Sequence, residues 1–237
     1  MSVDTDNPNY DSRNDCNAII ETASNTLISG CKNTVIPNSV TSTGYGAFAG
    51  CSNLTSVTIP EGVTSIGWGT FAGCSSLTSI TIPESVTSIG DDAFMGCSSL
   101  TSITIPEGVT SIGEFAFDGC NGLNYITSKI KNPFRVRFAS FSFNYSTPLY
   151  VPAGTKEKYL TTEDWNRFTN IIEIDEEITA GDINGDGRIS ISDVSMLTNY
   201  LLGKNPENFN SEAADVNGDG RISISDISKL VNQLLNK

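Results

Sequence analysis

A unit of 23 residues repeats between about residues 30 and 128, and it constrains the fold more than any other feature of the sequence. The copies at 50–72, 73–95 and 96–118 share the pattern LTSxTIPExVTSIG, and a shortened copy occupies 30–49. One proline and one phenylalanine keep their place in every copy: Pro37, Pro60, Pro83 and Pro106, and Phe48, Phe71, Phe94 and Phe117. Because so short a unit cannot bury its apolar residues alone, the copies are expected to stack around one shared core, as in a solenoid.

Each unit divides into extended pieces and turns. In the copy at 73–95, three apolar residues at L-x-x-I-x-I spacing would lie on one side of a short strand. Pro83 ends this strand because proline cannot donate a hydrogen bond to a ladder. Val86 and Ile89 are expected to point inward from a second extended piece, and Phe94 is expected to lie on a tight turn or a helical stub.

These residues resemble the BspA-like leucine-rich repeat family, whose units carry the pattern LxxIxIPxxVxxIGxxAFxxC. The resemblance covers about residues 1–175 and implies a right-handed solenoid with one short parallel strand per repeat. It also implies a bacterial surface or secreted protein that acts in adhesion or ligand binding. The fold class predicted for this part is an α+β repeat protein.

The segments that flank the regular copies fit the same family. Residues 1–10 resemble the tail of an earlier repeat, so we expect the chain to begin within a longer solenoid. Residues 16–31 are predicted to form an inserted hairpin that turns at 22–25. Residues 145–175 resemble the closing segment of the family, with a strand, a short helix and a second strand at 171–174. Such a cap covers the open apolar end, and its short helix is expected to carry Tyr159, Trp165 and Phe168.

The chain has six cysteines, and five of them share one position of the repeat: Cys31, Cys51, Cys74, Cys97 and Cys120. Stacked strands would hold these side chains parallel and about 4.8 Å apart, whereas a disulfide requires a torsion near 90°. We therefore expect free thiols in the core. A bridge between Cys16 and Cys31, which would face each other across the hairpin, remains the alternative.

The sequence changes character after residue 175. Residues 182–193 (DINGDGRISISD) and 215–226 (DVNGDGRISISD) are two copies of an EF-hand-type calcium loop. Calcium takes six to eight oxygen ligands, which such a loop supplies at fixed positions. The predicted ligands of the two ions are Asp182, Asn184, Asp186, the Arg188 carbonyl, Ser190 and Asp193, and Asp215, Asn217, Asp219, the Arg221 carbonyl, Ser223 and Asp226. Ile189 and Ile222, at position 8, are expected to join the loops by a short β-bridge.

A helix is predicted after each loop, from apolar residues at i, i+3, i+4, i+7 and i+8 spacing; in the second helix these are Ile227, Leu230, Val231, Leu234 and Leu235. The whole segment 181–237, joined by a linker at 176–180, resembles the type I dockerin family and would form a small all-α domain. The resemblance implies docking to a cohesin-like partner. One departure concerns loop positions 10 and 11, which often carry a Ser-Thr-like recognition pair. Here these positions are Ile191-Ser192 and Ile224-Ser225, which puts the identity of the partner in question.

A ligand site on the solenoid is predicted where the repeats vary. The two residues before each Ala/Thr-Phe differ between copies and would align in one stripe: Tyr45, Trp68, Asp91, Asp92, Glu114 and Phe115. Exposed aromatic residues at variable positions suit a glycan or a host matrix protein, although a solvated loop edge is the alternative. A basic cluster follows, where the repeat degenerates, and would bind an anionic polymer or form a solvated loop: Lys129, Lys131, Arg135 and Arg137.

Composition narrows the functional classes. The chain has no histidine, which excludes a histidine-based triad and histidine-ligated zinc. A net charge of -13 argues against nucleic acid as a partner, and no apolar run approaches the ~20 residues that span a bilayer. Met1 is followed by no basic and apolar leader, so we expect a piece of a longer secreted or cell-surface protein. The predicted function is non-catalytic binding or adhesion, with a purely structural spacer as the alternative.

Overall fold

The computed structural model describes residues 1–137, 139–141, 145–174, 180–185 and 188–235. The chain forms two compact units, residues 1–175 and 176–237. The predicted linker at 176–180 lies outside the described residues except for Ala180.

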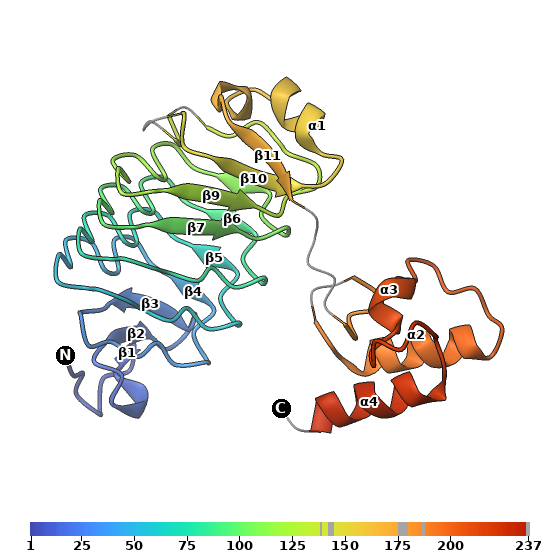
Figure 1. Cartoon of the computed structure of the whole chain (residues 1–237). Coiled ribbons are helices and arrows are strands. Elements are labelled where there is room, and N and C mark those ends of the chain that lie inside the picture. The colour runs from blue at the N-terminus through green and yellow to red at the C-terminus, as the bar shows by residue number, and fades with distance from the viewer. Residues whose placement is uncertain (138, 142–144, 175–179, 186–187, 236–237) are drawn as a thin grey trace. The chain divides into compact units, whose positions relative to one another are not determined.

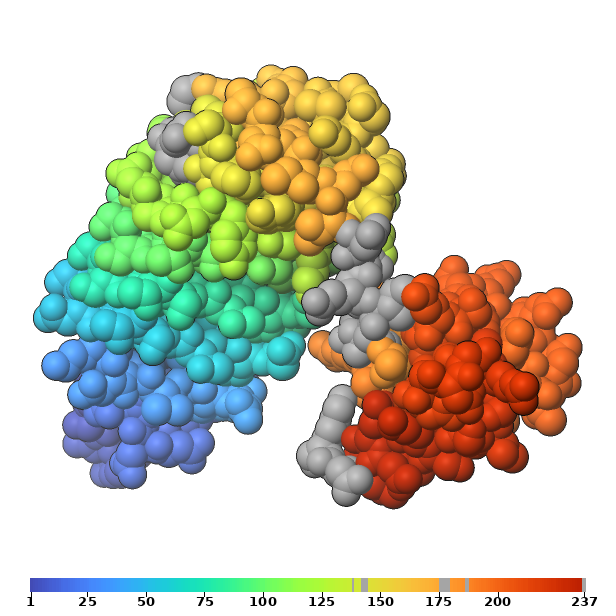
Figure 2. Space-filling view, viewed as in Figure 1, coloured from blue at the N-terminus to red at the C-terminus, as the bar shows by residue number. Residues whose placement is uncertain are grey.

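The first unit is a solenoid whose turns stack along two sheets (Figure 1). The seven-stranded sheet contains β1 (Tyr10–Asp11), β2 (Ile19–Glu21), β3 (Thr26–Ser29), β4 (Ser42–Thr43), β5 (Ser65–Ile66), β6 (Ser88–Ile89) and β8 (Ser111–Ile112), in that order. The four-stranded sheet contains β11 (Ile171–Ile174), β10 (Leu149–Pro152), β9 (Tyr125–Ser128) and β7 (Ser102–Ile105), in that order. In the space-filling view, successive turns form adjoining bands of colour along this unit (Figure 2).

The parallel ladder runs mainly through the second extended piece of each repeat. β5 pairs with β6 at Ser65↔Ser88, and β6 pairs with β8 at Ser88↔Ser111. The sequence had placed the strand one segment earlier, at the L-x-x-I-x-I residues. In that earlier segment, the first repeat copy with a strand is the one that contains β7. The two copies before it are joined there by a single β-bridge, Thr58↔Thr81. The apolar residues of this segment are nevertheless buried as predicted, so side-chain packing holds these turns where the hydrogen-bond ladder is incomplete.

A stack of five phenylalanines forms the axis of the core. The ring centroids of Phe48, Phe71, Phe94, Phe117 and Phe141 follow one another at 5.3, 5.4, 5.3 and 5.4 Å. Phe141 belongs to the degenerate copy, which therefore completes a further turn beyond the predicted end of the repeats near residue 128. The stack continues into the cap, because Phe141 lies 5.0 Å from Trp165 and 5.4 Å from Phe168 between ring centroids.

The cap consists of β10, helix α1 (Lys156–Thr161), the 3-10 turn η2 (Trp165–Arg167) and β11. Its three predicted aromatic residues are buried. They do not share one helix as predicted, because α1 ends at Thr161 and Trp165 lies on η2. Asp164 precedes this turn with a φ of 71°, a left-handed conformation that a continuous right-handed helix excludes.

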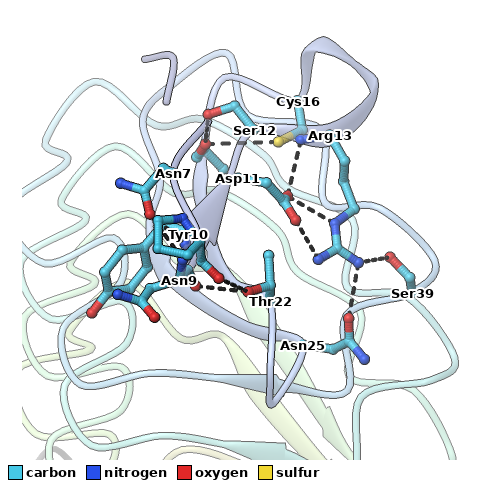
Figure 3. Close-up of polar contacts among 12 residues, drawn as sticks. Asn7, Asn9, Tyr10, Asp11, Ser12, Arg13, Cys16, Thr22, Asn25 and Ser39 are labelled. Atoms are coloured by element: carbon cyan, nitrogen blue, oxygen red, sulfur yellow. Dashed lines mark hydrogen bonds and ion pairs between the residues drawn. The ribbon is translucent and has the colours of Figure 1, made fainter. Parts of the chain in front are cut away.

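The N-terminal segment differs from the predicted tail of an earlier repeat. β1 pairs with β2 antiparallel, and β2 pairs with β3 antiparallel, whereas the strands of stacked repeats pair in parallel. Arg13, on the 3-10 turn η1 (Arg13–Asp15), connects these elements through Asp11, Asn25 and Ser39 (Figure 3). Its guanidinium holds the pKa of the Asp11 carboxyl below its ordinary value. This end of the sheet is therefore formed by antiparallel pairing, with polar contacts from Arg13 and with Ile20 and Leu27 buried in the core, rather than by a stacked repeat.

The second unit packs α2 (Ile191–Leu201), α3 (Ser211–Ala214) and α4 (Ile224–Leu235) around a small core. Both long helices occur where the sequence predicted them, and Gly203, at a φ of 77°, follows the first. The short helix α3 was not predicted, because four residues show no periodicity. The core contains Ile183, Leu197, Ala214, Val216 and Leu230. Leu235, which was predicted on the apolar face, is 77% exposed at the end of α4.

Candidate functional site

Each calcium-type loop of the second unit is closed by a buried aspartate from the following helix. In the first loop, Asp193 Oδ1 accepts hydrogen bonds from the amides of Ile183 and Asn184, at 2.8 and 3.1 Å. Its Oδ2 accepts from the Ser190 amide at 2.9 Å. Ser190 caps α2, so Ser190 and Asp193 form a capping box. The position-12 carboxylate therefore joins the two ends of the loop.

The second loop repeats this arrangement. Asp226 Oδ1 accepts from the Asn217 amide at 3.1 Å, and its Oδ2 accepts from the Ser223 amide at 2.9 Å. Asp215 Oδ2 accepts from the amide of Gly220 at 2.7 Å. Gly220 has a φ of 80°, which supplies the sharp turn that the sequence required at position 6. The loop is thus folded around its first and last carboxylates.

The donor chemistry of these loops fits calcium. The predicted ligands are carboxylate, amide, hydroxyl and backbone oxygens only, as a hard cation requires. Within the described residues no three acidic or cysteine side chains gather as a metal cluster, and Asp186 lies outside them. Each carboxylate oxygen carries two lone pairs, so the amide contacts of Asp215 and Asp226 leave lone pairs for an ion.

Residues Ile189 and Ile222 do not form the predicted β-bridge between the loops. Across the described part of the chain, the one isolated bridge is Thr58↔Thr81. Both isoleucine side chains instead pack against the small core of the second unit. Apolar burial therefore links the two loops.

Positions 10 and 11 of the loops are both exposed but differ in role. Ile191 and Ile224, at position 10, are 74% and 77% exposed. Ser192 and Ser225, at position 11, are also exposed, and their hydroxyls accept from the side-chain amides of Asn184 and Asn217, at 3.1 and 2.9 Å. The two loops therefore present the same surface, in which the isoleucine is the exposed apolar group.

On the solenoid, the side chains of the predicted stripe differ in their roles, and several of them contact one another. The indole N–H of Trp68 donates to Asp92 Oδ2 at 2.7 Å. Tyr45 meets Trp68 edge-on, with ring centroids 4.8 Å apart. The second member of each pair occupies a left-handed turn: Gly46, Gly69, Asp92 and Phe115 have φ values of 58°, 60°, 54° and 53°. The backbone thus adopts this turn in every pair, and exposed aromatic side chains occur at both positions, Tyr45 and Trp68 at the first and Phe115 at the second.

A groove lies beside this stripe, over β5, β6 and β8. Its volume is about 520 Å³, and its lining includes Trp68, Asp91, Arg135 and Arg137. The structure therefore brings together part of the stripe and part of the basic cluster, which the sequence had treated separately. The other two basic residues pair with glutamates of earlier turns: Lys129 with Glu84 at 2.6 Å, and Lys131 with Glu107 at 3.5 Å. Asp91 also accepts from the Glu114 amide at 2.8 Å.

All six cysteines are free thiols, as the repeat spacing predicted. Cys16 is buried in the core, and Cys31 lies against the Asn17 carbonyl at 3.5 Å, so they form no bridge. In three successive turns the thiol meets a phenylalanine carbonyl of an earlier turn: Cys74–Phe48 at 3.2 Å, Cys97–Phe71 at 3.2 Å and Cys120–Phe94 at 3.1 Å. The ladder of sulfur atoms is therefore a structural feature of the core.

Thiol reactivity should follow this burial. A hydrogen bond from the backbone of Asn33 lowers the pKa of the Cys31 thiol, whereas burial raises the pKa of Cys74 to about 12. Since the thiolate is the reactive form, we expect iodoacetamide to label Cys31 first in the native chain. Mass spectrometry after timed labelling checks this, and Cys31→Ser should remove the fast phase. Equal native labelling of Cys74 would contradict the buried ladder.

These features define a leucine-rich-repeat solenoid joined to a two-loop module of the calcium-binding type. The chain belongs to the BspA-type leucine-rich repeat family: the model of the BspA type leucine rich repeat region matches six copies over residues 24–148. Residues 180–235 match the dockerin type I domain. Dockerin type I domains generally bind calcium, and both modules are non-catalytic.

Individual proteins are each similar to part of this chain. Endoglucanase B of Acetivibrio thermocellus is 60% identical over 37 residues, which is 16% of this chain and 6% of that protein. The crystal structure of the pneumococcal vaccine antigen PcpA is 19% identical with a TM-score of 0.59, and covers 74% of this chain and 50% of that one; it shows the fold alone. A leucine-rich repeat protein from Bacteroides ovatus is 25% identical with a TM-score of 0.43, over 60% and 53% of the two chains. This chain therefore spans 6% of that endoglucanase and about half the length of each of the two solved structures.

No helix among the described residues has the length and apolar character required to cross a membrane.

Proposed function

We propose that this chain is a non-catalytic component of an extracellular or cell-surface assembly. In this proposal the second unit holds two calcium ions and docks to a cohesin-like partner, while the solenoid presents a ligand-binding surface. The dockerin match supports the docking role, and the repeat family supports the binding role. The proposed localisation follows from the same two families.

The observation that carries the docking role is the duplicated surface of the second unit. Ile191 and Ile224 are the first residues of α2 and α4, and both are largely exposed. The exposed hydroxyls of Ser192 and Ser225 already bond to the loop asparagines, so in this proposal the isoleucines supply the apolar contact with a partner. Exposed aliphatic residues at two equivalent places suit a partner with an apolar pocket, which either copy can occupy.

Aspartate substitutions test this surface. We expect Ile191→Asp or Ile224→Asp alone to weaken calcium-dependent binding to a panel of purified cohesin modules by about tenfold or less, because the other copy remains. The double variant should lose at least about a hundredfold, since a charge then meets the apolar pocket in both orientations. Surface-bound cohesin and the full chain with calcium, measured by biolayer interferometry, provide the readout.

The matched control is Val35→Asp, the same change at a solenoid residue that is 72% exposed, and it should leave the affinity unchanged. Full cohesin binding by the double variant would refute the role of the isoleucines. If no cohesin module binds the calcium-loaded chain, the docking proposal itself fails.

A further inference from the structure

The groove on the solenoid exists because its floor is built from serine and glycine in successive turns. Ser65, Ser88 and Ser111 project outward from strands whose isoleucines are buried. The glycines of the same turns lie too close to the neighbouring backbone for any side chain: a Cβ at Gly67 would lie 2.2 Å from the Thr43 carbonyl oxygen, and one at Gly113 would lie 2.3 Å from the Asp91 nitrogen. The floor therefore has no side chains at the glycine positions and presents the serine hydroxyls.

One end of this groove carries a fixed aromatic surface. The indole of Trp68 is held by its hydrogen bond to Asp92 and by the edge of Tyr45. Trp68 nevertheless remains 52% exposed. An aromatic ring that is oriented before binding costs a ligand little ordering entropy. Such a surface stacks on the flat, apolar face of a sugar ring.

The other end of the groove carries two arginines at positions where the earlier turns have serine and glycine. The Arg137 amide donates to the Ile112 carbonyl at 3.3 Å, as the Gly113 amide does to the Ile89 carbonyl at 2.9 Å. Arg137 therefore occupies the glycine row, and Arg135, two residues earlier, occupies the serine row. The degenerate copy thus closes the hydroxyl floor with two guanidinium groups.

The charge of the lining selects an anionic ligand. Two arginines and one aspartate line the groove, in a chain whose net charge is -13. Arg135 pairs with Glu163 at 3.0 Å, and Arg137 lies 4.0 Å from Asp91. All four side chains are more than 40% exposed, and ion pairs at such exposure contribute little. A ligand carboxylate can therefore replace them, and guanidinium binds carboxylate through two parallel hydrogen bonds.

The spacing of the two ends indicates an elongated ligand. Trp68 and Arg137 belong to turns that are three repeats apart, which corresponds to about 14 Å at the strand spacing of a sheet. We propose that this groove binds an oligosaccharide chain that contains uronic acid residues. One sugar ring stacks on Trp68, hydroxyls meet the serine row, and a carboxylate of the same chain binds Arg135 and Arg137. The inference rests on the proposed binding role of the solenoid and gives it a ligand class.

Calorimetric titration of the full chain with a defined galacturonic acid oligomer tests this inference. We expect binding that weakens with salt, because the arginine–carboxylate contact is solvent-exposed. Arg135→Gln combined with Arg137→Gln should reduce the affinity at least about tenfold, and so should Trp68→Ala. The matched controls are Lys129→Gln combined with Lys131→Gln, which removes the same charge outside the groove, and Tyr125→Ala, an aromatic residue that is 42% exposed. Both controls should stay within about twofold of the wild type.

Other ligands separate this inference from the proposed function. A neutral glucan oligomer of equal length that binds as tightly as the uronate would overturn the assignment of an acidic ligand. A glutamate oligopeptide that binds as tightly and is lost with the same variants would overturn the assignment of a glycan. Binding of the uronate that survives the arginine and tryptophan variants would overturn the site. If the uronate does not bind but a glycan or matrix-protein screen finds a ligand for the solenoid, this inference fails while the binding role stands; if that screen also finds nothing, the binding role fails too.

Discussion

Replacing Phe94 with alanine is expected to lower the free energy of unfolding of the solenoid by about 3–5 kcal/mol. Phe94 is fully buried and stacks between Phe71 and Phe117, at centroid distances of 5.4 and 5.3 Å. Its removal leaves a cavity in the middle of the aromatic stack and breaks two ring contacts at once. Because each turn of a solenoid is stabilised mainly by its neighbours, the defect should also weaken the coupling between the turns on either side.

Urea unfolding followed by tryptophan fluorescence measures this effect. The chain has two tryptophans, and Trp68 and Trp165 both lie in the first unit, so their signal reports on the solenoid. The matched control is Phe115→Ala, the same substitution in the next repeat copy. Phe115 belongs to the stripe, and its side chain is 36% exposed. We expect a loss of about 1 kcal/mol or less from this control. Equal losses from the two variants would show that the stack does not hold the turns together.

Removal of calcium is expected to unfold the second unit and to leave the solenoid folded. Among the described residues of the second unit, five form its apolar core cluster, and a module of this size rarely buries enough apolar surface to fold alone. If the dissociation constant of each loop for calcium is about a thousandfold below the ambient calcium concentration, mass action adds about 4 kcal/mol per site. Chelation withdraws this contribution, and the acidic loop residues then repel one another.

Far-UV circular dichroism and tryptophan fluorescence separate the two units in one thermal scan. With EDTA, the helical signal of α2 and α4 should disappear at low temperature while the tryptophan transition stays in place. Asp215→Asn, at the first position of the second loop, should lower the module's melting temperature in calcium, whereas Glu212→Gln, on α3 and outside both loops, should not. A helical signal that resists EDTA would mean that the core alone folds this module.

Local patterns account for much of the observed fold. The prolines and phenylalanines repeat every 23 residues, and this spacing predicted the stacked turns, whereas the ring stack itself was seen only in the structure. Apolar residues at helical spacing after each twelve-residue loop predicted α2 and α4. The free thiols followed from the repeat register, since stacked side chains are parallel.

The expectations that were wrong depended on contacts between distant residues. The antiparallel pairing of β1 is set by a partner strand and by Arg13, not by the sequence of 1–10 itself. The fifth ring of the stack, Phe141, follows a degenerate copy whose one-residue insertion hides it from a fixed period. The missing bridge between Ile189 and Ile222 reflects packing of both side chains on the core of the second unit.

The sequence by itself determined the repeat, the apolar face of each turn and the oxygen-rich composition of the two loops, because these depend on residues close together along the chain. Only the tertiary structure decided which side chains share a surface. It placed Arg135 and Arg137 in the serine and glycine rows of earlier turns, at the end of a groove that begins at Trp68. The physical reason is that the groove forms where successive turns have serine or glycine instead of a larger side chain. These positions lie next to one another only when the turns stack.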